Sequence, residues 1–171
     1  MPEYFDVVDE EDNVIDRRPG RECVKEGLLH RAIAAFLFDS KGEVYLQRRA
    51  DSMLWYPGSW TISCTGHVSS GETYTKAARR EVKEELGLDC ELTSLGKVLS
   101  PKWKYRGIVE WEYLCIFESV VSDPITLSDE TKEGMFLPFP EFKRRVSEDP
   151  FSFTPDTILA FEHYSKAKGT R

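Results

Sequence analysis

The chain has 171 residues and a formal net charge of −7, from 30 acidic and 23 basic side chains. This length is typical of one domain with a well-buried core, so we expect a single domain over residues 1–171. The longest apolar run, residues 32–38, is far shorter than the roughly 20 residues that cross a membrane. The sequence also contains no block of Lys and Arg residues of the kind that binds a nucleic-acid polymer. We therefore expect neither a membrane nor a long nucleic acid as partner.

Four cysteines, Cys23, Cys64, Cys90 and Cys115, are spread along the chain without a CxxC pair. This spacing indicates neither a disulfide framework nor a zinc ribbon. The N-terminus is acidic and lacks the basic and apolar segments of a signal peptide. We expect reduced thiols and a cytoplasmic location.

The first third of the chain is predicted to contain two hairpins and a loop. A short hairpin covers about residues 4–17, with a polar turn in its middle. A longer hairpin joins residues 31–38 to residues 43–48 through a turn that ends in glycine. Residues 50–59 contain a Pro-Gly pair and are predicted to be a loop.

A helix is predicted over residues 73–86. Thr73 can cap its N-terminus, and Gly87 supplies the left-handed residue that commonly ends a helix. Ala78, Val82 and Leu86 recur at helical spacing and are expected to face the core.

The second half of the chain alternates between a strand, a loop and a final helix. Residues 108–117 alternate in polarity and predict a strand, and the acidic residues 122–134 predict a loop. A last helix is expected over about residues 155–167, opened by Thr154-Pro155. Interleaved strands and helices predict an α/β or α+β layered fold.

Three glutamates crowd one face of the predicted helix. Glu81, Glu84 and Glu85 stand at positions i, i+3 and i+4, where like charges repel in an isolated helix. A solvated acidic face is the plain interpretation of this cluster. A hard cation such as Mg²⁺ would give the three carboxylates a shared role, because it prefers oxygen ligands and is often shared with substrate phosphates.

The wider pattern favours the cation. Gly66 is followed by five residues and Glu72, then by seven residues and Arg80-Glu81, an aliphatic residue, Glu84-Glu85 and Gly87-Leu88. A chance match to so many fixed identities is roughly one in a million at ordinary residue frequencies. Residues 66–88 resemble the Nudix box at every specified position, so the chain looks like a Nudix hydrolase.

The resemblance implies a fold, a cofactor and a set of site residues. The fold is an α/β/α sandwich with a mixed β-sheet and a loop–helix–loop catalytic motif. The cofactor is Mg²⁺ or Mn²⁺, held by Glu81, Glu84 and Glu85, often with the carbonyl of Gly66. Arg80 would orient the glutamates, and Glu72 would support the metal shell. Which glutamate accepts the proton of the attacking water stays open.

Residues outside the box resemble the type I isopentenyl diphosphate isomerase branch of the Nudix fold. With them, the match covers about residues 4–120. The segments that carry this resemblance are Leu29-His30-Arg31-Ala32, Gln47-Arg48-Arg49, Tyr56-Pro57-Gly58-Ser59-Trp60-Thr61 and Gly66-His67.

The isomerase resemblance implies a second metal site. His30, His67, Glu110 and Glu112 fall where four of the isomerase metal ligands belong, and Cys23 stands at the fifth, a histidine in the isomerase. Glu110 and Glu112 are two residues apart on a predicted strand, so their side chains point to one face. The plainer alternatives are a structural His30 and a solvent-facing pair of glutamates.

Two departures argue against isomerase chemistry. The isomerase carries a catalytic cysteine immediately before its Gly-His pair, where this chain has Thr65. Cys64 is adjacent, but neighbouring side chains on an extended segment point to opposite sides. A basic residue that helps to hold the diphosphate in the isomerase is replaced by Met53.

Several residues are candidates for contact with substrate. Arg48, Arg49 and Lys104 are basic and lie near the expected cleft, where they could bind phosphate, and His67 lies in the motif loop. The alternative for Lys104 and its neighbours is an exposed loop. Trp55, Trp60 and Trp111 are expected to pack in the core or loops, although one could stack on a base. His163 is expected at the surface.

The sequence leads to three functional hypotheses. The first is metal-dependent hydrolysis of a diphosphate linkage in a nucleoside di- or triphosphate or a related small organic pyrophosphate. The alternative is an isopentenyl diphosphate Delta-isomerase-like activity, and the third is a non-catalytic nucleotide sensor. The expected partner is a small diphosphate substrate. Homodimers are common in the superfamily, so a homodimer is also open.

Overall fold

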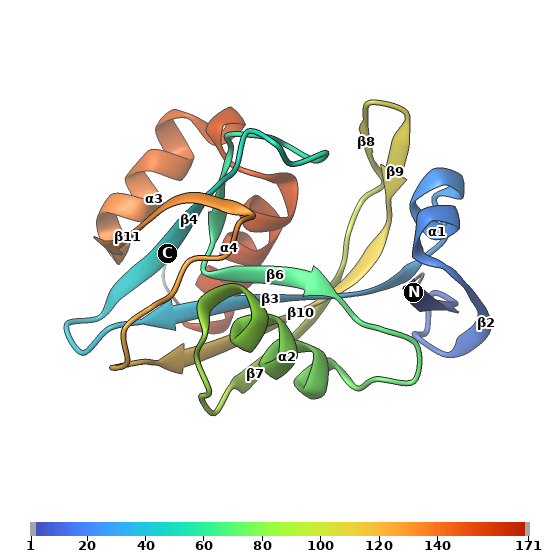
Figure 1. Cartoon of the computed structure of the whole chain (residues 1–171), viewed down its shortest axis with the longest axis horizontal. Coiled ribbons are helices and arrows are strands. Elements are labelled where there is room, and N and C mark those ends of the chain that lie inside the picture. The colour runs from blue at the N-terminus through green and yellow to red at the C-terminus, as the bar shows by residue number, and fades with distance from the viewer. Residues whose placement is uncertain (1–2, 170–171) are drawn as a thin grey trace.

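A mixed β-sheet with helices on both faces forms the centre of the computed structural model, which describes residues 3–169 (Figure 1). Its elements are β1 (Tyr4–Val8), β2 (Val14–Pro19), α1 (Gly20–Glu26), β3 (His30–Phe38), β4 (Glu43–Arg49), β5 (Trp60–Ile62), β6 (Cys64–His67), α2 (Tyr74–Leu86), β7 (Thr93–Leu99), β8 (Trp103–Tyr105), β9 (Ile108–Glu110), β10 (Glu112–Val120), β11 (Thr131–Pro138), α3 (Phe139–Glu148), the 3-10 helix η1 (Pro150–Ser152) and α4 (Pro155–Ala167). The α/β/α sandwich with a mixed sheet, expected from the sequence, is confirmed.

The main sheet has the strand order β11-β4-β3-β10-β7, with β5 paired to β4 and β6 paired to β3. Strand β10 runs parallel to β3, whereas the other pairings in this sheet are antiparallel. Two further hairpins, β1–β2 and β8–β9, form separate two-stranded sheets.

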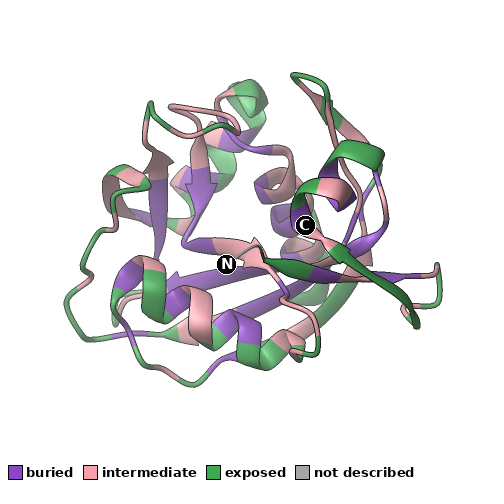
Figure 2. Ribbon diagram, turned by 45° about the vertical axis from the view of Figure 1, so that its right-hand side comes forward, coloured by how far each residue is buried: buried purple, intermediate pink, exposed green. Residues whose placement is uncertain are grey.

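The central strand β3 is buried on both faces, which explains its unbroken apolar sequence. Ala32, Ala34 and Phe36 pack toward helices α3 and α4. The residues between them pack on the other side, where Ala78 and Val82 belong to the buried face of α2. Figure 2 shows burial concentrated along the central strands and the inward faces of the helices. The helix carrying the acidic cluster is therefore fixed against the sheet through its apolar stripe.

The predicted hairpin of β3 and β4 opens along its length. The two strands pair directly at Phe38 and Val44, next to the turn. Further from the turn, β6 pairs with β3 from Ala32 to Ala35, and β5 pairs with β4. The two strands thus separate, and short strands fill their free edges.

Two sequence predictions need correction. The strand predicted over residues 108–117 is divided at Trp111, because β9 pairs with β8 whereas β10 joins the main sheet from Glu112 onward. The loop predicted over residues 122–134 ends at residue 130, because β11 begins at Thr131. The polar sequence of β11 is typical of a loop, although the segment is an edge strand. Gly134 leaves room there for the Tyr45 hydroxyl, because a β-carbon at this position would lie 1.8 Å from it.

Both predicted helices are confirmed. Helix α2 begins after Thr73, whose side chain accepts a hydrogen bond from the Lys76 N–H, and it ends at Gly87 with φ 72°. Helix α4 covers residues 155–167, with Pro155 at its first turn. Within residues 3–169, no helix is both long and apolar enough to cross a membrane.

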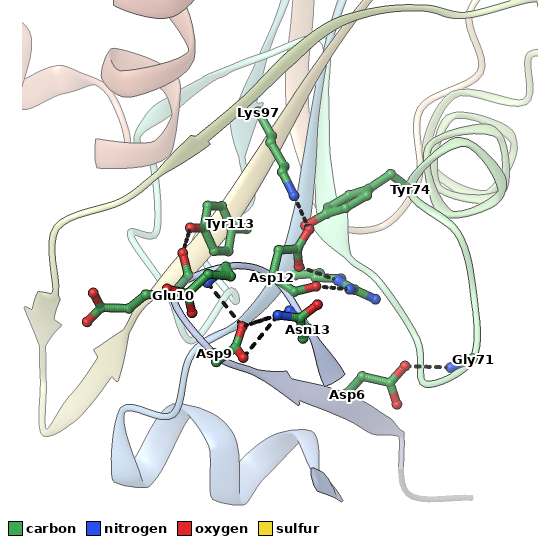
Figure 3. A network of polar contacts seen from close by, with 11 residues as sticks. Asp6, Asp9, Glu10, Asp12, Asn13, Gly71, Tyr74, Lys97 and Tyr113 are labelled. Carbon is green, nitrogen blue, oxygen red and sulfur yellow. Dashed lines mark hydrogen bonds and ion pairs between the residues drawn. The ribbon is translucent and has the colours of Figure 1, made fainter. Parts of the chain in front are cut away.

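The β1–β2 hairpin is tied to the rest of the molecule by a polar network at its turn (Figure 3). The buried carboxylate of Asp12 accepts hydrogen bonds from Arg31 Nε at 2.6 Å and Tyr74 Oη at 3.1 Å, and it pairs with Lys97. At the other end, Asp6 accepts a hydrogen bond from the Gly71 N–H. The N-terminal hairpin is therefore held against both β3 and the motif loop.

Candidate active site

A cavity of about 340 Å³ lies where β3 and β4 separate. Its floor contains Thr65, Gly66 and His67 from β6 and two glutamates from α2. The lining residues of this cavity are Glu3, Ala32, Ile33, Arg49, Met53, Trp55, Tyr56, Thr65, Gly66, His67, Glu81, Glu85, Trp103, Glu110, Glu112, Leu114, Glu130, Thr154, Pro155 and Asp156. Two sets of potential metal ligands therefore face one space.

The helix glutamates occupy different environments. Glu81 and Glu85 line the cavity, whereas Glu84 is exposed and lies outside the lining. Glu85 is half-buried, and its carboxylate accepts a hydrogen bond of 2.8 Å from Gln47 Nε2. Burial raises the pKa of Glu85 to about 8 and also raises the pKa of Glu81. Two poorly solvated acids at one cavity wall are costly without a cation beside them.

Arg80 holds the acidic face together. Its guanidinium donates to Glu72 at 3.0 Å, to Glu81 at 2.7 Å and to Glu84 at 3.2 Å. It also donates to the carbonyl oxygen of His67 at 3.0 Å, which joins the helix to the motif loop. The role expected for Arg80, orienting the glutamates, agrees with these contacts, and Glu72 acts on the site through Arg80.

Gly66 allows the loop to approach the helix. A β-carbon at Gly66 would stand 2.3 Å from Glu81 Cδ, far inside any normal contact. The backbone of β6 therefore lies directly against the Glu81 carboxylate. This closeness is what a shared ligand set of the Gly66 carbonyl and the box glutamates requires.

The second ligand set joins four strands. His30 begins β3, His67 ends β6, and Glu110 and Glu112 flank the break between β9 and β10. One ligand atom from each of these four residues lies within 4.8 Å of the others. The geometry brings together the four residues that the isomerase resemblance implied as ligands, and Glu110 and Glu112 lie on one side, as their spacing predicts.

The distances in this cluster suit a shared cation better than direct pairing. His30 Nε2 lies 3.6 Å from both Glu110 Oε2 and Glu112 Oε1. His67 Nε2 lies 3.8 and 3.3 Å from the same two oxygens. These separations exceed most hydrogen bonds, but they are similar to the edges between ligands that each lie about 2.0–2.2 Å from one ion.

The tautomer of His30 is set by its backbone contact. His30 Nδ1 lies 2.8 Å from the carbonyl oxygen of Leu28, so it is the nitrogen that carries the proton. His30 Nε2 and Glu110 Oε2 are buried and have no hydrogen-bond partner among the described residues. Buried nitrogen and oxygen atoms that have no hydrogen-bond partner and converge on one point indicate a metal site.

The charges of the cluster depend on one another. Burial alone would lower the pKa of His67, but Glu110 and Glu112 outweigh it and hold this pKa well above the ordinary value. Burial alone would raise the pKa of Glu112, but the two histidines hold it low. A bound divalent cation would replace the imidazole proton as the positive charge of this site.

The N-terminal hairpin covers the histidines. The Phe5 ring stacks on His67 with centroids 4.6 Å apart and on His30 at 5.2 Å. Cys23, which stands at the fifth ligand position of the isomerase resemblance, packs in an apolar cluster with Phe5 and Val7. It is outside the four-residue ligand group found among the described residues.

Comparison with known proteins identifies the family. A family model described as a NUDIX domain matches residues 28–157. The chain belongs to the NUDIX domain family. Among curated relatives, it is 32% identical over 155 residues to an isopentenyl-diphosphate Delta-isomerase 2 from Photorhabdus laumondii, covering 90% of this chain and 88% of that protein.

Two other proteins match along nearly the whole chain. An uncharacterized Nudix hydrolase from Pseudomonas aeruginosa is 32% identical over 162 residues, covering 94% of this chain and 92% of that protein. A crystal structure of a Deinococcus radiodurans protein has a TM-score of 0.73 at 23% identity, covering 95% of this chain and 98% of that one. The structural likeness confirms the fold, and the relatives' names include both an isomerase and a hydrolase.

The Nudix cavity has the departures that the sequence predicted. Thr65 and Met53 line it, whereas Cys64 is fully buried in the core beneath α2. Burial raises the pKa of Cys64 well above the ordinary thiol value. The residue before the Gly-His pair therefore lines the cavity with a hydroxyl side chain, whereas the adjacent thiol lies outside the lining, against the Glu85 carboxyl group.

Only one of the three predicted phosphate-binding cations lies in the cavity wall. Arg49 lines the cavity and donates a hydrogen bond from Nε to the Trp55 carbonyl oxygen at 2.9 Å. Arg48 instead donates to Gly58 O and pairs with Glu133 at 2.9 Å. Lys104 is exposed on the β8–β9 hairpin, outside the lining.

Several lining residues were not predicted from the sequence as site residues, and Tyr56 entered only as part of an isomerase-like segment. Tyr56, Trp103 and Asp156 come from the loop after β4, from β8 and from the first turn of α4. Their spacing along the chain contains no motif, because the fold alone brings these segments together. The sequence signals were the isomerase-like segment that begins at Tyr56 and the aromatic content of the two loops. His163, expected at the surface, is half-buried, with Nε2 3.1 Å from the Leu95 carbonyl oxygen.

Proposed function

We propose that this protein is a metal-dependent Nudix hydrolase that cleaves the diphosphate linkage of a nucleoside di- or triphosphate or a related small organic pyrophosphate. The observation that carries the proposal is the arrangement of the box residues at one cavity. Glu81 and Glu85 face the cavity, Gly66 lies against Glu81, and Arg80 connects the helix to the loop.

The proposed cofactor is Mg²⁺ or Mn²⁺. Glu81, Glu85 and the Gly66 carbonyl would hold it, with Glu84 and Glu72 at the edge of the set. The cluster of His30, His67, Glu110 and Glu112 would hold a further ion. When bound, such ions neutralise charge on a diphosphate and lower the pKa of water.

The protein's own groups have distinct tasks in this proposal. In hydrolysis, the water oxygen bonds to phosphorus while the bridging phosphorus–oxygen bond breaks, and the proton of the water passes to a carboxylate. Arg80 keeps Glu81 in place during this step, because its guanidinium is fixed by the His67 carbonyl. Arg49 is the lining guanidinium that could contact a phosphate oxygen.

The test is turnover on a panel of nucleotides and organic pyrophosphates with Mg²⁺ or Mn²⁺. We expect Glu81→Gln and Glu85→Gln to lower kcat by at least about 100-fold without loss of folding. Glu91→Gln is the matched control, because Glu91 is exposed and pairs with Arg79 away from the cavity. Near-normal turnover in both cavity variants would overturn the proposal. A comparable loss in Glu84→Gln would include that carboxylate in the metal-binding set.

The second candidate is an isopentenyl diphosphate Delta-isomerase-like activity. It is favoured by the His30, His67, Glu110 and Glu112 cluster and by relatives that bear the isomerase name. Thr65 argues against it, because a hydroxyl is a much weaker acid than a thiol. Deuterium incorporation from D₂O into isopentenyl diphosphate would establish this activity, and its absence would leave hydrolysis as the chemistry. A sensor without catalysis would bind nucleotide and release no phosphate with either metal.

A further inference from the structure

The cavity has more acidic groups than its two metal-ligand sets use. Seven acids line it, and among the described residues Arg49 is the sole lining guanidinium or ammonium group. Four of these acids belong to the ligand sets. Of the other three, Glu3 accepts a hydrogen bond from Ser69 Oγ at 3.1 Å, and Glu130 is exposed. Asp156 is left as a half-buried carboxyl group without a role in metal binding.

Asp156 stands in the first turn of α4 and faces into the cavity wall. Burial raises the pKa of Asp156 and the nearby Glu112 raises it further, whereas a hydrogen bond from Thr154 and the charge of Arg49 oppose this rise. A diphosphate placed against this wall would add negative charge beside a carboxyl group that is already poorly solvated. The wall near Asp156 therefore suits the part of a substrate that carries no phosphate and can donate hydrogen bonds.

Aromatic side chains form the rest of this end of the cavity. Trp55 and Tyr56 come from the loop after β4, and Trp103 comes from β8. The Tyr56 ring packs against the Tyr105 ring, tilted by 30° with centroids 4.2 Å apart, so the loop and the β8–β9 hairpin are in contact there. Flat, polarisable walls of this kind bind planar rings by stacking.

The conformation of Tyr56 indicates that this wall is held in place. Tyr56 has φ +43°, a left-handed conformation that costs a bulky residue on the order of 1 kcal/mol or more. Burial raises the pKa of its hydroxyl, and Asp156 and Glu110 raise it further, so the hydroxyl keeps its proton beside these carboxyl groups. Strain of this kind persists where surrounding contacts fix a side chain at a site.

We infer that Asp156 and the aromatic wall of Trp55, Tyr56 and Trp103 recognise a planar ring that bears an amino group, so that the preferred substrates are diphosphates of amino-substituted nucleobases. The inference rests on the proposed function and names its substrate class. The ring packs against the aromatic wall, and its amino group donates a hydrogen bond to the Asp156 carboxyl oxygen. A base without that amino group, or an aliphatic group, leaves the half-buried carboxyl group without this hydrogen bond, which is costly.

The experiment measures binding through the quenching of tryptophan fluorescence, with Ca²⁺ in place of Mg²⁺ to prevent turnover. GDP is compared with IDP, which lacks only the 2-amino group, and CDP is compared with UDP, which has an oxo group instead. We expect GDP and CDP to bind at least about tenfold more tightly than their partners. Asp156→Ala should remove this preference, and Asp156→Asn should shift it toward UDP. Glu162→Gln, an exposed change on the same helix, should leave it unchanged.

Each other outcome contradicts a specific statement. Equal affinities within both pairs, or no binding of any of the four at millimolar concentration, would overturn the inference. A preference that survives in folded Asp156→Ala protein would overturn the role of Asp156. Selective binding without phosphate release under Mg²⁺ or Mn²⁺ would support the inference while refuting the proposed hydrolase. Equal turnover of all four nucleotides would refute the inference and leave the hydrolase standing.

Discussion

The backbone of Gly66 lies against the carboxylate of Glu81, so that a β-carbon on Gly66 would be 2.3 Å from Glu81 Cδ and 2.6 Å from Oε1. The loop strand β6 and the helix α2 can approach this closely only with glycine at position 66. Arg80 fixes the same approach from the other side through Glu81 and the carbonyl of His67. The geometry of the cavity floor thus depends on one missing methyl group.

Gly66→Ala is therefore expected to displace Glu81 and impair the site. Because a misplacement of about 1 Å can cost about 100-fold in rate, we expect kcat to fall at least that far. Overpacking should also lower the free energy of unfolding by about 1–3 kcal/mol. Steady-state kinetics and urea denaturation measure the two effects. Gly71→Ala is the control: Gly71 has φ 78° and open space around it, so it should lose stability and keep activity.

The parts of the site that follow local rules could be predicted from the sequence. Thr73 and Gly87 mark both ends of α2, because capping and a left-handed terminal residue act over a few positions. Glu110 and Glu112 meet on one face, because side chains alternate along an extended segment. In each case, a short stretch of chain contains the whole physical cause.

The aromatic and acidic end of the cavity could not be predicted in this way. Tyr56, Trp103 and Asp156 meet because β3 and β4 separate and because β8 and β9 leave the main sheet. Both features depend on which strands pair across the whole domain. The ion pair between Arg48 and Glu133 could not be predicted either, because it depends on β11 pairing with β4, and the sequence of β11 predicts a loop.

Asp12 is expected to stabilise the N-terminal hairpin in a pH-dependent way. Burial alone would raise its pKa, but Lys97 and Arg31 outweigh burial and hold the pKa below its ordinary value of 3.8. The native state then binds fewer protons than the unfolded state near this pH. The stabilisation is therefore complete above about pH 4 and is lost as the pH falls through the lowered native pKa.

Asp12→Asn isolates this charge, because asparagine tolerates the positive φ of 65° found at position 12. We expect the free energy of unfolding to fall by about 1–3 kcal/mol at pH 7 and the difference to shrink below pH 3.8. Urea denaturation at several pH values measures it. Asp16→Asn, an exposed change on β2, should be nearly neutral. A difference that is constant down to pH 2 would show that Asp12 does not act through its charge.

Metal binding at the histidine cluster should appear in thermal stability. A ligand at 100 times its Kd stabilises the native state by about 2.7 kcal/mol, so Mn²⁺ added to chelator-treated protein should raise Tm by about 5–10 °C. His30→Asn should remove most of this shift, because the unpartnered Nε2 is lost. His163→Asn is the control, since His163 contacts Leu95 on another face. An equal shift in His30→Asn protein would assign the effect to the box glutamates alone.

Of the neighbouring positions 64 and 65, we expect only position 65 to face the cavity, and a cysteine placed there tests this directly. Thr65 lines the cavity, whereas Cys64 is fully buried and burial raises the pKa of its thiol. Both proteins in this experiment carry Cys90→Ser, which removes the half-exposed native thiol. We expect iodoacetamide to modify the protein that also carries Thr65→Cys, and to leave Cys64 unmodified in the protein that keeps Thr65. Mass spectrometry of the labelled peptides separates the two positions. Labelling of Cys64 without Thr65→Cys would mean that β6 presents its other face, and the cavity would then contain a thiol as the isomerase chemistry requires.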